Sequence, residues 1–433
     1  MNKARRAALV WLVLTISLPA TLCAATGPVW EQGRIKPSAN KGKTGSYHCE
    51  TTRDGYHYFV YVPKSYSDSN PAGIHIFYHG QASQKNAHSF DLWAGKLLEP
   101  YNLIGINMEY EDGDNAKDTK GKVLSSEEAI AQVMADYKVV KGRGIISSFS
   151  GGGLPHGDVY TQYGLKNCPR SAWPFNHAAI YDTNFRVSAS GGLPMSWTVA
   201  LGTEEWNLAD LGGTQSHRAQ ELFGDAAKGA CPDIYFKIDK GKGHVIADAD
   251  VAAAAECFAR SDLAYAPFMY APDYTEKELA LIVALANTMA YGRAATMLDK
   301  VLADAKAAQP VKDKAAVLKK LLDERIEKIV ALAKDLTAND PLLGNFYGSL
   351  FVQQLTGHPR QKEVKGMVMA MQKDKNFRNA LAAFDLFTKQ LGSFFNGNKV
   401  ATGMVPLLEQ VQKLSGEKSL IGRMAADYLQ LKD

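Results

Sequence analysis

The sequence predicts an α/β fold, with a mostly parallel sheet flanked by helices, followed by an all-α C-terminal domain. Between about residues 47 and 262, short runs rich in β-branched and aromatic residues alternate with helical patterns, which is typical of βαβ units. After Thr275 no convincing strand appears. Instead, Leu318, Leu322, Ile326 and Ile329 recur at steps of four, four and three residues, the spacing of one apolar helix face.

The expected elements divide the chain into an α/β domain over 26–263 and a helical domain over 275–433. Residues 26–46 read as a polar lead-in loop. Thr275-Glu276-Lys277-Glu278 has the pattern of a capping box at a helix start. The expected helices of the first domain are Ser125–Val140 and Gln215–Phe223, and its expected strands are Tyr56–Val62, Ile74–Tyr78, Leu103–Met108, Gly144–Ser148, His177–Tyr181, Trp197–Leu201 and Ile234–Ile238.

Residues 1–25 are predicted to be a signal peptide. Three basic residues precede an apolar run, Ala7–Leu18, and the small residues Ala24 and Ala25 then mark a cleavage site. An uncleaved anchor helix would need a longer run of about 20 residues. A lipoprotein at Cys23 would need a small residue before the cysteine, where Leu22 stands. We therefore expect a secreted or periplasmic protein.

The net charge argues against two classes of partner. The leader carries three positive charges and no negative ones, so its removal lowers the formal net charge from +4 to +1. A nearly neutral protein has no electrostatic basis for binding nucleic acid or an anionic membrane. No other segment of the sequence is predicted to span a membrane.

Four cysteines follow the leader, and an even number in an exported chain favours disulfides. Cys231 directly precedes the last expected strand, and Cys257 lies on the helix that returns to the same sheet edge, so we expect these two to be bonded. Cys49 and Cys168 form the remaining pair. No two cysteines have the spacing of metal ligands, so no metal site is expected.

A candidate nucleophile lies in Ser148-Phe149-Ser150-Gly151-Gly152, between an expected strand and a helical segment. A strand that turns sharply into a helix holds its turn residue in a strained conformation and needs small residues two positions away on each side. Ser148 and Gly152 are small, which makes Ser150 the candidate. The motif taken alone is also compatible with an ordinary Ser/Gly loop.

A candidate oxyanion loop, His79-Gly80-Gln81, follows another apolar strand. The tetrahedral intermediate of acyl transfer needs preorganised N–H donors. The backbone N–H groups of Gly151, after the nucleophile, and of Gln81, in this loop, are the expected pair. We interpret the side chain of His79 as a structural turn histidine.

The candidate general base is His244, in the loop Gly241-Lys242-Gly243-His244 after the last strand. A triad also needs an acid to orient the imidazole. Glu205, after the strand Trp197–Leu201, fits best. Glu204, Asp210 and Asp182 remain alternatives, because surface carboxylates are common.

The order nucleophile, acid, histidine, with each element at the end of an expected strand, resembles that of α/β-hydrolases. The loops HGQ, SFSGG, GTEE and GKGH resemble those of secreted esterases, in particular polyhydroxybutyrate depolymerase-like and feruloyl or acetylxylan esterase-like enzymes. The resemblance covers roughly residues 50–260. Two departures stand out: Ser148 replaces the usual first glycine of the elbow, and Glu205 the usual aspartate.

The resemblance implies a serine carboxylic-ester hydrolase that works through an acyl-enzyme without metal or organic cofactor. The substrate would be a small or polymeric ester, with Tyr78, Trp93 and Trp206 as candidates for shaping its pocket. Two alternatives stay open. One is a serine peptidase on the same fold. The other is a catalytically degenerate hydrolase that acts as a binding or scaffold protein, with a protein or polymer partner on its helical domain.

Overall fold

The computed structural model describes residues 35–80, 89–110, 118–159, 173–182, 195–204, 220–224 and 231–432. The expected signal peptide lies outside these ranges. Within them, no helix is both long enough and apolar enough to cross a bilayer.

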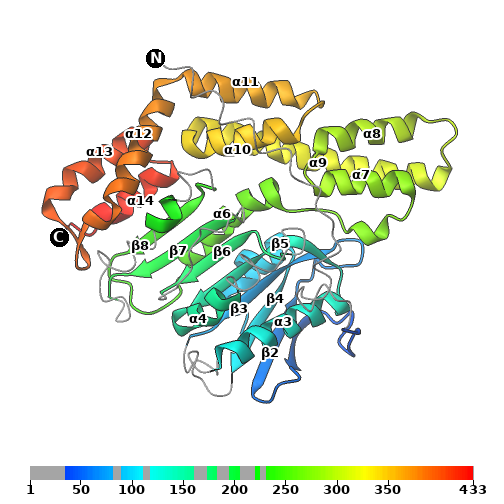
Figure 1. Ribbon diagram of the computed structural model, residues 1–433, viewed down its shortest axis with the longest axis horizontal. Helices are drawn as coiled ribbons and strands as arrows, with labels where there is room; N and C mark the ends of the chain where they lie inside the picture. The colour runs from blue at the N-terminus through cyan, green and yellow to red at the C-terminus, as the bar shows by residue number, and fades with distance from the viewer. Residues whose placement is uncertain are drawn as a thin grey trace.

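A mixed eight-stranded sheet forms the centre of the described α/β part, as Figure 1 shows. Its spatial order is β1-β2-β4-β3-β5-β6-β7-β8. Strands β1 and β2 run antiparallel to their neighbours, and all other pairs are parallel. This order and pairing define the α/β-hydrolase fold and confirm the predicted fold class. The strands are β1 Gly45–Glu50, β2 Tyr56–Val62, β3 Ala72–Tyr78, β4 Leu103–Tyr110, β5 Val139–Phe149, β6 His177–Tyr181, β7 Ser196–Gly202 and β8 Ile234–Asp239.

Helices cover both faces of the sheet, and the alternation of side chains along the strands decides which face each residue meets. In β5, Ile145 belongs to one apolar cluster and Ile146 to the other. The first cluster lies under α1 Asp91–Trp93, η4 Ala94–Leu98 and α6 Asp248–Tyr265. The second lies under α3 Thr119–Asp136 and α4 Gly153–Val159. Because both faces are covered, β3, β6 and β7 are buried along their whole length.

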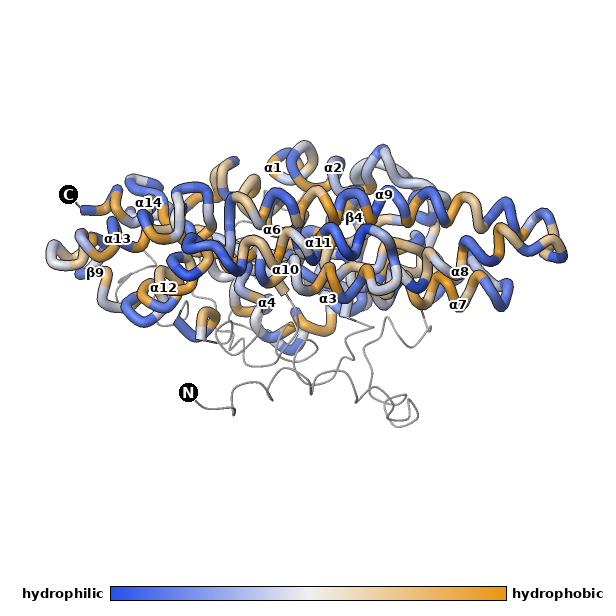
Figure 2. The backbone as a smooth tube through the Cα atoms, turned by 90° about the horizontal axis from the view of Figure 1, so that it is seen from above, coloured by the Kyte–Doolittle hydropathy of each residue, from blue (hydrophilic) through white to orange (hydrophobic). Residues whose placement is uncertain are grey.

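The C-terminal part is helical, as predicted, and arches along one side of the sheet (Figure 1). Seen from above, α7–α9 form one end of the molecule and α12–α14 lie at the other (Figure 2). The predicted apolar stripe of α9 is buried. The elements are α7 Lys277–Asn287, α8 Tyr291–Ala303, α9 Gln309–Asn339, α10 Pro341–Gln354, α11 Arg360–Lys373, α12 Lys375–Gln390, a short hairpin of β9 Phe395–Asn396 and β10 Lys399–Val400, α13 Val405–Ser415 and α14 Leu420–Leu429.

Helix α14 covers the edge strand β8. The backbone N–H of Phe236 donates to Met424 Sδ at 3.2 Å, and Tyr428 Oη donates to the carbonyl of Phe236 at 3.2 Å. An uncovered edge strand would offer these groups to another chain. One apolar cluster runs from the sheet into these helices without a break, so the helical part is packed onto the α/β part rather than tethered to it.

The helical part also meets the sheet at the amino ends of its strands. Tyr347 Oη on α10 donates to Asp233 Oδ2 at 2.8 Å, directly before β8. Asp233 is paired as well with Arg260 on α6, at 2.7 Å. Arg325 on α9 donates to backbone carbonyls at the end of α6, including that of Ala266 at 3.0 Å. These buried contacts fix the end of the sheet opposite to the candidate site.

The structure does not form the expected Cys231–Cys257 disulfide. Both are buried free thiols, and each Sγ faces a different partner: Cys231 Sγ lies 3.5 Å from Tyr347 Oη, and Cys257 Sγ accepts from Arg260 at 3.1 Å. Placement near the same sheet edge was therefore insufficient to join them. Cys49 is also a free thiol, and Cys168 lies outside the described residues.

Several local expectations differ from the structure, and β4, β5 and α3 have other bounds than expected. The lead-in region ends in a strand, β1, rather than continuing as a loop. Helix α3 ends at Asp136, because Val139 already pairs with Ala72 in the sheet. The expected capping box at Thr275 does not form, since Glu276 occupies the N-cap of α7 without a side-chain cap.

Candidate active site

Ser150 occupies a strained turn between β5 and the helical segment η5 Ser150–Gly152 that leads into α4. Its φ angle is 52°, in the left-handed region that residues other than glycine seldom adopt. Strain of this kind is concentrated at functional sites, where the surrounding structure holds it in place. The structure therefore has the sharp strand-to-helix turn that the sequence predicted around Ser150.

Two glycines allow the loop after β3 to pack closely against this turn. A Cβ on Gly152 would lie 2.2 Å from the carbonyl oxygen of Tyr78, closer than any real contact. A Cβ on Gly80 would lie 3.0 Å from Cβ of Ser150. The expected oxyanion loop therefore begins beside the candidate nucleophile.

His79 supports this loop rather than the chemistry. Its side chain is 3% exposed, and Nδ1 lies 2.5 Å from the carbonyl oxygen of Gly80, which can only accept a hydrogen bond. Burial lowers the pKa of His79, so the ring is neutral at pH 7. This agrees with its interpretation as a turn histidine. Gln81 lies outside the described residues.

Ser148, which replaces the usual first glycine of the elbow, has a buried hydrogen-bond partner. Ser148 Oγ and His156 Nδ1 share a hydrogen bond of 2.8 Å, and both side chains are fully buried. The bond ties the end of β5 to α4 across the turn that carries Ser150. Sequence reasoning did not identify His156. The available signal was a hydroxyl at an elbow position that normally holds glycine.

His244 lies beside the nucleophile turn. Its ring is stacked on that of Phe149, with centroids 4.4 Å apart and planes inclined by 29°. Phe149 directly precedes Ser150, so two loops that are far apart in sequence meet here. The structure thus places the predicted base against Phe149, the residue directly before the predicted nucleophile. Val245, the next residue, is 53% exposed.

A buried cluster of charges anchors the His244 loop. Lys242 Nζ lies 2.9 Å from Asp250, 3.5 Å from Asp239 and 3.7 Å from Asp182. Asp250 also accepts from the backbone N–H of Ala247 at 2.9 Å, at the far end of the loop. Burial alone would raise the pKa of Asp250, but Lys242 and Lys237 outweigh it and hold that pKa below its usual value.

Two of the four candidate acids can be placed. Glu204 follows β7 and is exposed. Asp182 follows β6, is fully buried with φ of 42°, and accepts the backbone N–H of Gly202 at 2.8 Å. Asp182 thus joins the ends of β6 and β7. Glu205 and Asp210 lie outside the described residues.

The structure places Tyr78 and Trp93, two of the residues expected to shape the substrate pocket, in the core. Both are almost wholly buried, at 0% and 2% exposure. Tyr78 stacks on His156, and Trp93 packs against Phe77 in the core of the sheet face. These aromatics are core residues because helices cover both faces of β3. Trp206 lies outside the described residues.

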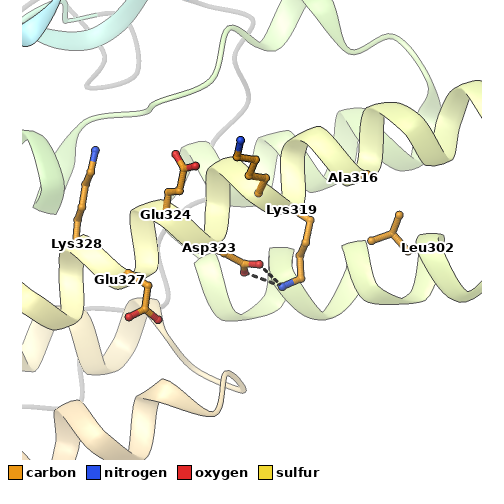
Figure 3. Close-up of a pocket in the computed structure, with 8 residues that line it drawn as sticks. Leu302, Ala316, Lys319, Asp323, Glu324, Glu327 and Lys328 are labelled. Atoms are coloured by element: carbon orange, nitrogen blue, oxygen red, sulfur yellow. Dashed lines mark hydrogen bonds and ion pairs between the residues drawn. The ribbon is translucent and has the colours of Figure 1, made fainter.

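A hollow of about 710 Å³ lies elsewhere, on α8 and α9 (Figure 3). Charged side chains of α9 dominate its lining, and Lys319 and Asp323 pair with each other at 2.6 Å. It contains no arrangement of a nucleophile and a base. Across the described residues, no group of three or more His, Cys, Asp or Glu side chains is placed to hold a metal ion.

Neither a protein-family model nor a curated protein matches the sequence. Among solved structures, the chain is similar to a thermostable esterase, at 12% identity and a TM-score of 0.35 over 49% of this chain and 59% of that one. It is also similar to a thermophilic esterase from the planctomycete Thermogutta terrifontis. With propionate bound, the values are 14% identity and a TM-score of 0.33 over 48% of this chain and 87% of that one. For its native form, the identity is 13% and the TM-score is 0.33, over 54% of this chain and 95% of that one. The strand order and pairing of the sheet, rather than these similarities, define the fold.

Proposed function

We propose that the protein is an exported serine hydrolase that cleaves carboxylic esters, with Ser150 as nucleophile and His244 as general base. The observation that carries the proposal is the left-handed φ of Ser150 at the end of β5, with His244 stacked on the adjacent Phe149. A strained serine at a strand-to-helix turn, beside a histidine on the loop after the last strand, is the arrangement that acyl transfer on this fold requires.

The reaction proceeds in two steps. His244 accepts the proton of Ser150 as Oγ attacks the ester carbonyl, and the resulting imidazolium then protonates the leaving alcohol. Water, deprotonated by the same histidine, hydrolyses the acyl-enzyme and regenerates the serine. Backbone N–H groups of Gly151 and Gln81 stabilise the oxyanion in both steps. Glu205 orients the imidazole, with Glu204, Asp210 and Asp182 as alternatives.

The described residues around the site are compatible with this reaction. Gly80 and Gly152 let the loop after β3 pack directly against the turn that carries Ser150. Exposed Val245 beside His244 offers apolar surface to an acyl or alcohol group. Export remains part of the proposal through the N-terminal signal pattern and places the substrate outside the cytoplasm.

A panel of p-nitrophenyl esters of increasing acyl length, run beside a panel of peptide amides, tests the substrate class. We expect turnover of esters, an initial burst of p-nitrophenol from acylation, and no peptide cleavage. Ser150→Ala should lower ester turnover by several orders of magnitude. Ser46→Ala, on the exposed face of β1, is the matched control and should retain wild-type turnover. Peptide cleavage without ester cleavage would favour the peptidase alternative.

A further inference from the structure

We propose that the hairpin of the helical part, through Asn398, and Thr203 on the loop after β7 together position the loop that carries His244. Both are positioning residues, and the inference rests on the proposed function of His244. It assigns the C-terminal part a role at the catalytic edge of the sheet, beyond its packing at the opposite end.

Thr203 connects two of the loops at the carboxyl edge of the sheet. Its backbone N–H donates to the carbonyl of Asp239 at 3.1 Å, which continues the pairing of β7 with β8. Its Oγ1 accepts the backbone N–H of Gly241 at 2.8 Å. Gly241 has a φ of 75° and begins the turn that leads to His244. The hydroxyl of Thr203 therefore sets where this turn starts.

The peptide unit between Thr203 and Glu204 is held from both sides. Its carbonyl accepts a hydrogen bond from Nδ2 of Asn398 at 3.1 Å, and its N–H donates to the carbonyl of Lys242 at 3.0 Å. In a trans peptide the C=O and N–H groups point in opposite directions. The unit thus bridges the hairpin to the His244 loop, and hydrogen bonds linked in this way polarise one another.

The packing at Gly202 leaves the His244 loop little freedom to adjust if this bridge moves. A Cβ on Gly202 would lie 2.1 Å from the carbonyl oxygen of Lys242, so the two loops are in direct backbone contact. Lys242 is tied by its side chain to buried Asp250 as well. A displacement of the Thr203–Glu204 peptide would therefore move the backbone of Lys242, two residues before His244.

The hairpin is rigid enough to act as a support. Its strands β9 and β10 are joined by the two residues Gly397 and Asn398, and Gly397 supplies the positive φ of 61° that a tight turn needs. Phe395 is buried against Tyr428 of α14, with ring centroids 5.1 Å apart. The N–H of Val400 donates to the carbonyl of Leu431 at 3.0 Å. The hairpin is thus held in place by α14, which covers β8, and by the residues that follow α14.

The test compares Asn398→Asp with Asn396→Ala in the full-length protein. The aspartate keeps the size of the side chain but faces the Thr203 carbonyl with acceptors alone, while Asn396 is exposed on the same hairpin. We expect Asn398→Asp to lower kcat about tenfold, as sub-ångström displacement of a catalytic group does, with less than a twofold change in KM. Fluorophosphonate labelling of Ser150 should slow in parallel, and Asn396→Ala should leave both rates unchanged.

A second pair of variants separates positioning from folding. Thr203→Val removes the acceptor for Gly241 and should lower kcat, whereas Thr203→Ser retains it and should restore most of the rate. Unchanged kcat and labelling in Asn398→Asp would overturn the inference while leaving Ser150 as nucleophile. A loss that follows thermal stability equally in Thr203→Val and Thr203→Ser would also overturn it. A wild-type protein that is never labelled at Ser150 would overturn the proposed function itself, and the inference with it.

Discussion

Ser148 Oγ lies 2.8 Å from Nδ1 of His156, across the turn that carries Ser150. The two side chains are fully buried, and burial lowers the pKa of His156 to about 3. Both partners of this hydrogen bond are therefore neutral at pH 7. If one is removed, the other stays buried and cannot bond to solvent water instead.

Ser148→Ala is expected to destabilise the protein by about 1–3 kcal/mol, the cost of leaving a buried polar group without its partner. From the sequence alone this change would be nearly silent, because the elbow requires only a small residue there. Urea unfolding of wild type and variant measures the difference. The double variant Ser148→Ala/His156→Phe removes both polar groups and should recover part of the loss. A cost below about 0.5 kcal/mol for Ser148→Ala would show that the bond does not contribute.

Gly152→Ala should abolish folding or activity, because its Cβ would meet the carbonyl oxygen of Tyr78 at 2.2 Å. Backbone cannot move aside as a flexible side chain can. Gly95→Ala is the matched control, since a Cβ there meets nothing within 4 Å. Soluble yield and ester turnover of the two variants provide the comparison. Normal turnover in Gly152→Ala would mean that the loop after β3 does not pack against the turn as described.

The identity of the triad acid is tested by replacing carboxylates with amides. Glu205→Gln should lower kcat strongly without changing the unfolding midpoint, and Glu204→Gln should change neither. Asp182→Asn should lower stability, because Asp182 accepts from Gly202 and faces Lys242 in a buried cluster. A large loss of kcat in Asp182→Asn with unchanged stability would place the acid after β6 instead.

Three buried histidines predict a loss of stability in mild acid. Burial lowers the pKa of His75, His156 and His177 to about 3 each, from 6.5. Between these values the unfolded chain binds more protons than the folded one, so the free energy of unfolding falls as pH falls from 6.5. Asp427, Asp158 and Asp340 act in the opposite direction, since burial raises their pKa values, that of Asp427 to about 6. Burial also lowers the pKa values of His79 and His358, which adds to the effect of the three histidines.

Urea midpoints at pH 7 and pH 5 measure this effect, and we expect the midpoint to be lower at pH 5. The Ser148→Ala/His156→Phe variant has one titrating histidine fewer and should show a smaller decrease. A wild-type midpoint that is equal or higher at pH 5 would contradict the assignment of these rings as neutral.

The strands were predictable because their apolar runs are long and local. Tyr56–Val62 and His177–Tyr181 have the bounds that the sequence indicated. Strand β1 was only partly recognisable, since it is an edge strand in which half-buried and exposed residues alternate. The end of α3 was placed too late because Val139 and Val140 continue an apolar pattern, and only pairing with β3 assigns Val139 to the sheet.

The motif residues were predictable for a similar reason: the nucleophile turn and the His244 loop are short segments with specific composition. The contacts that support them left weak local signals, whether the partners are 8 residues apart, as in Ser148 and His156, or 195 apart, as in Thr203 and Asn398. Ser148 with His156, and Thr203 with Asn398, are recognised only once the chain is folded. The expected Cys231–Cys257 disulfide does not form, and Tyr78 and Trp93 lie in the core. Proximity along the chain does not show which way a side chain points.

The role of Ser150 is tested most directly by covalent labelling of the protein with a fluorophosphonate probe, followed by peptide mapping. The probe reacts with a serine that a neighbouring base activates. If Ser150 is the nucleophile, we expect one label per chain on Ser150 in wild type and in Ser46→Ala, and no label in Ser150→Ala. A label on another serine, or none on a folded wild-type protein, would contradict the claim that Ser150 is the nucleophile.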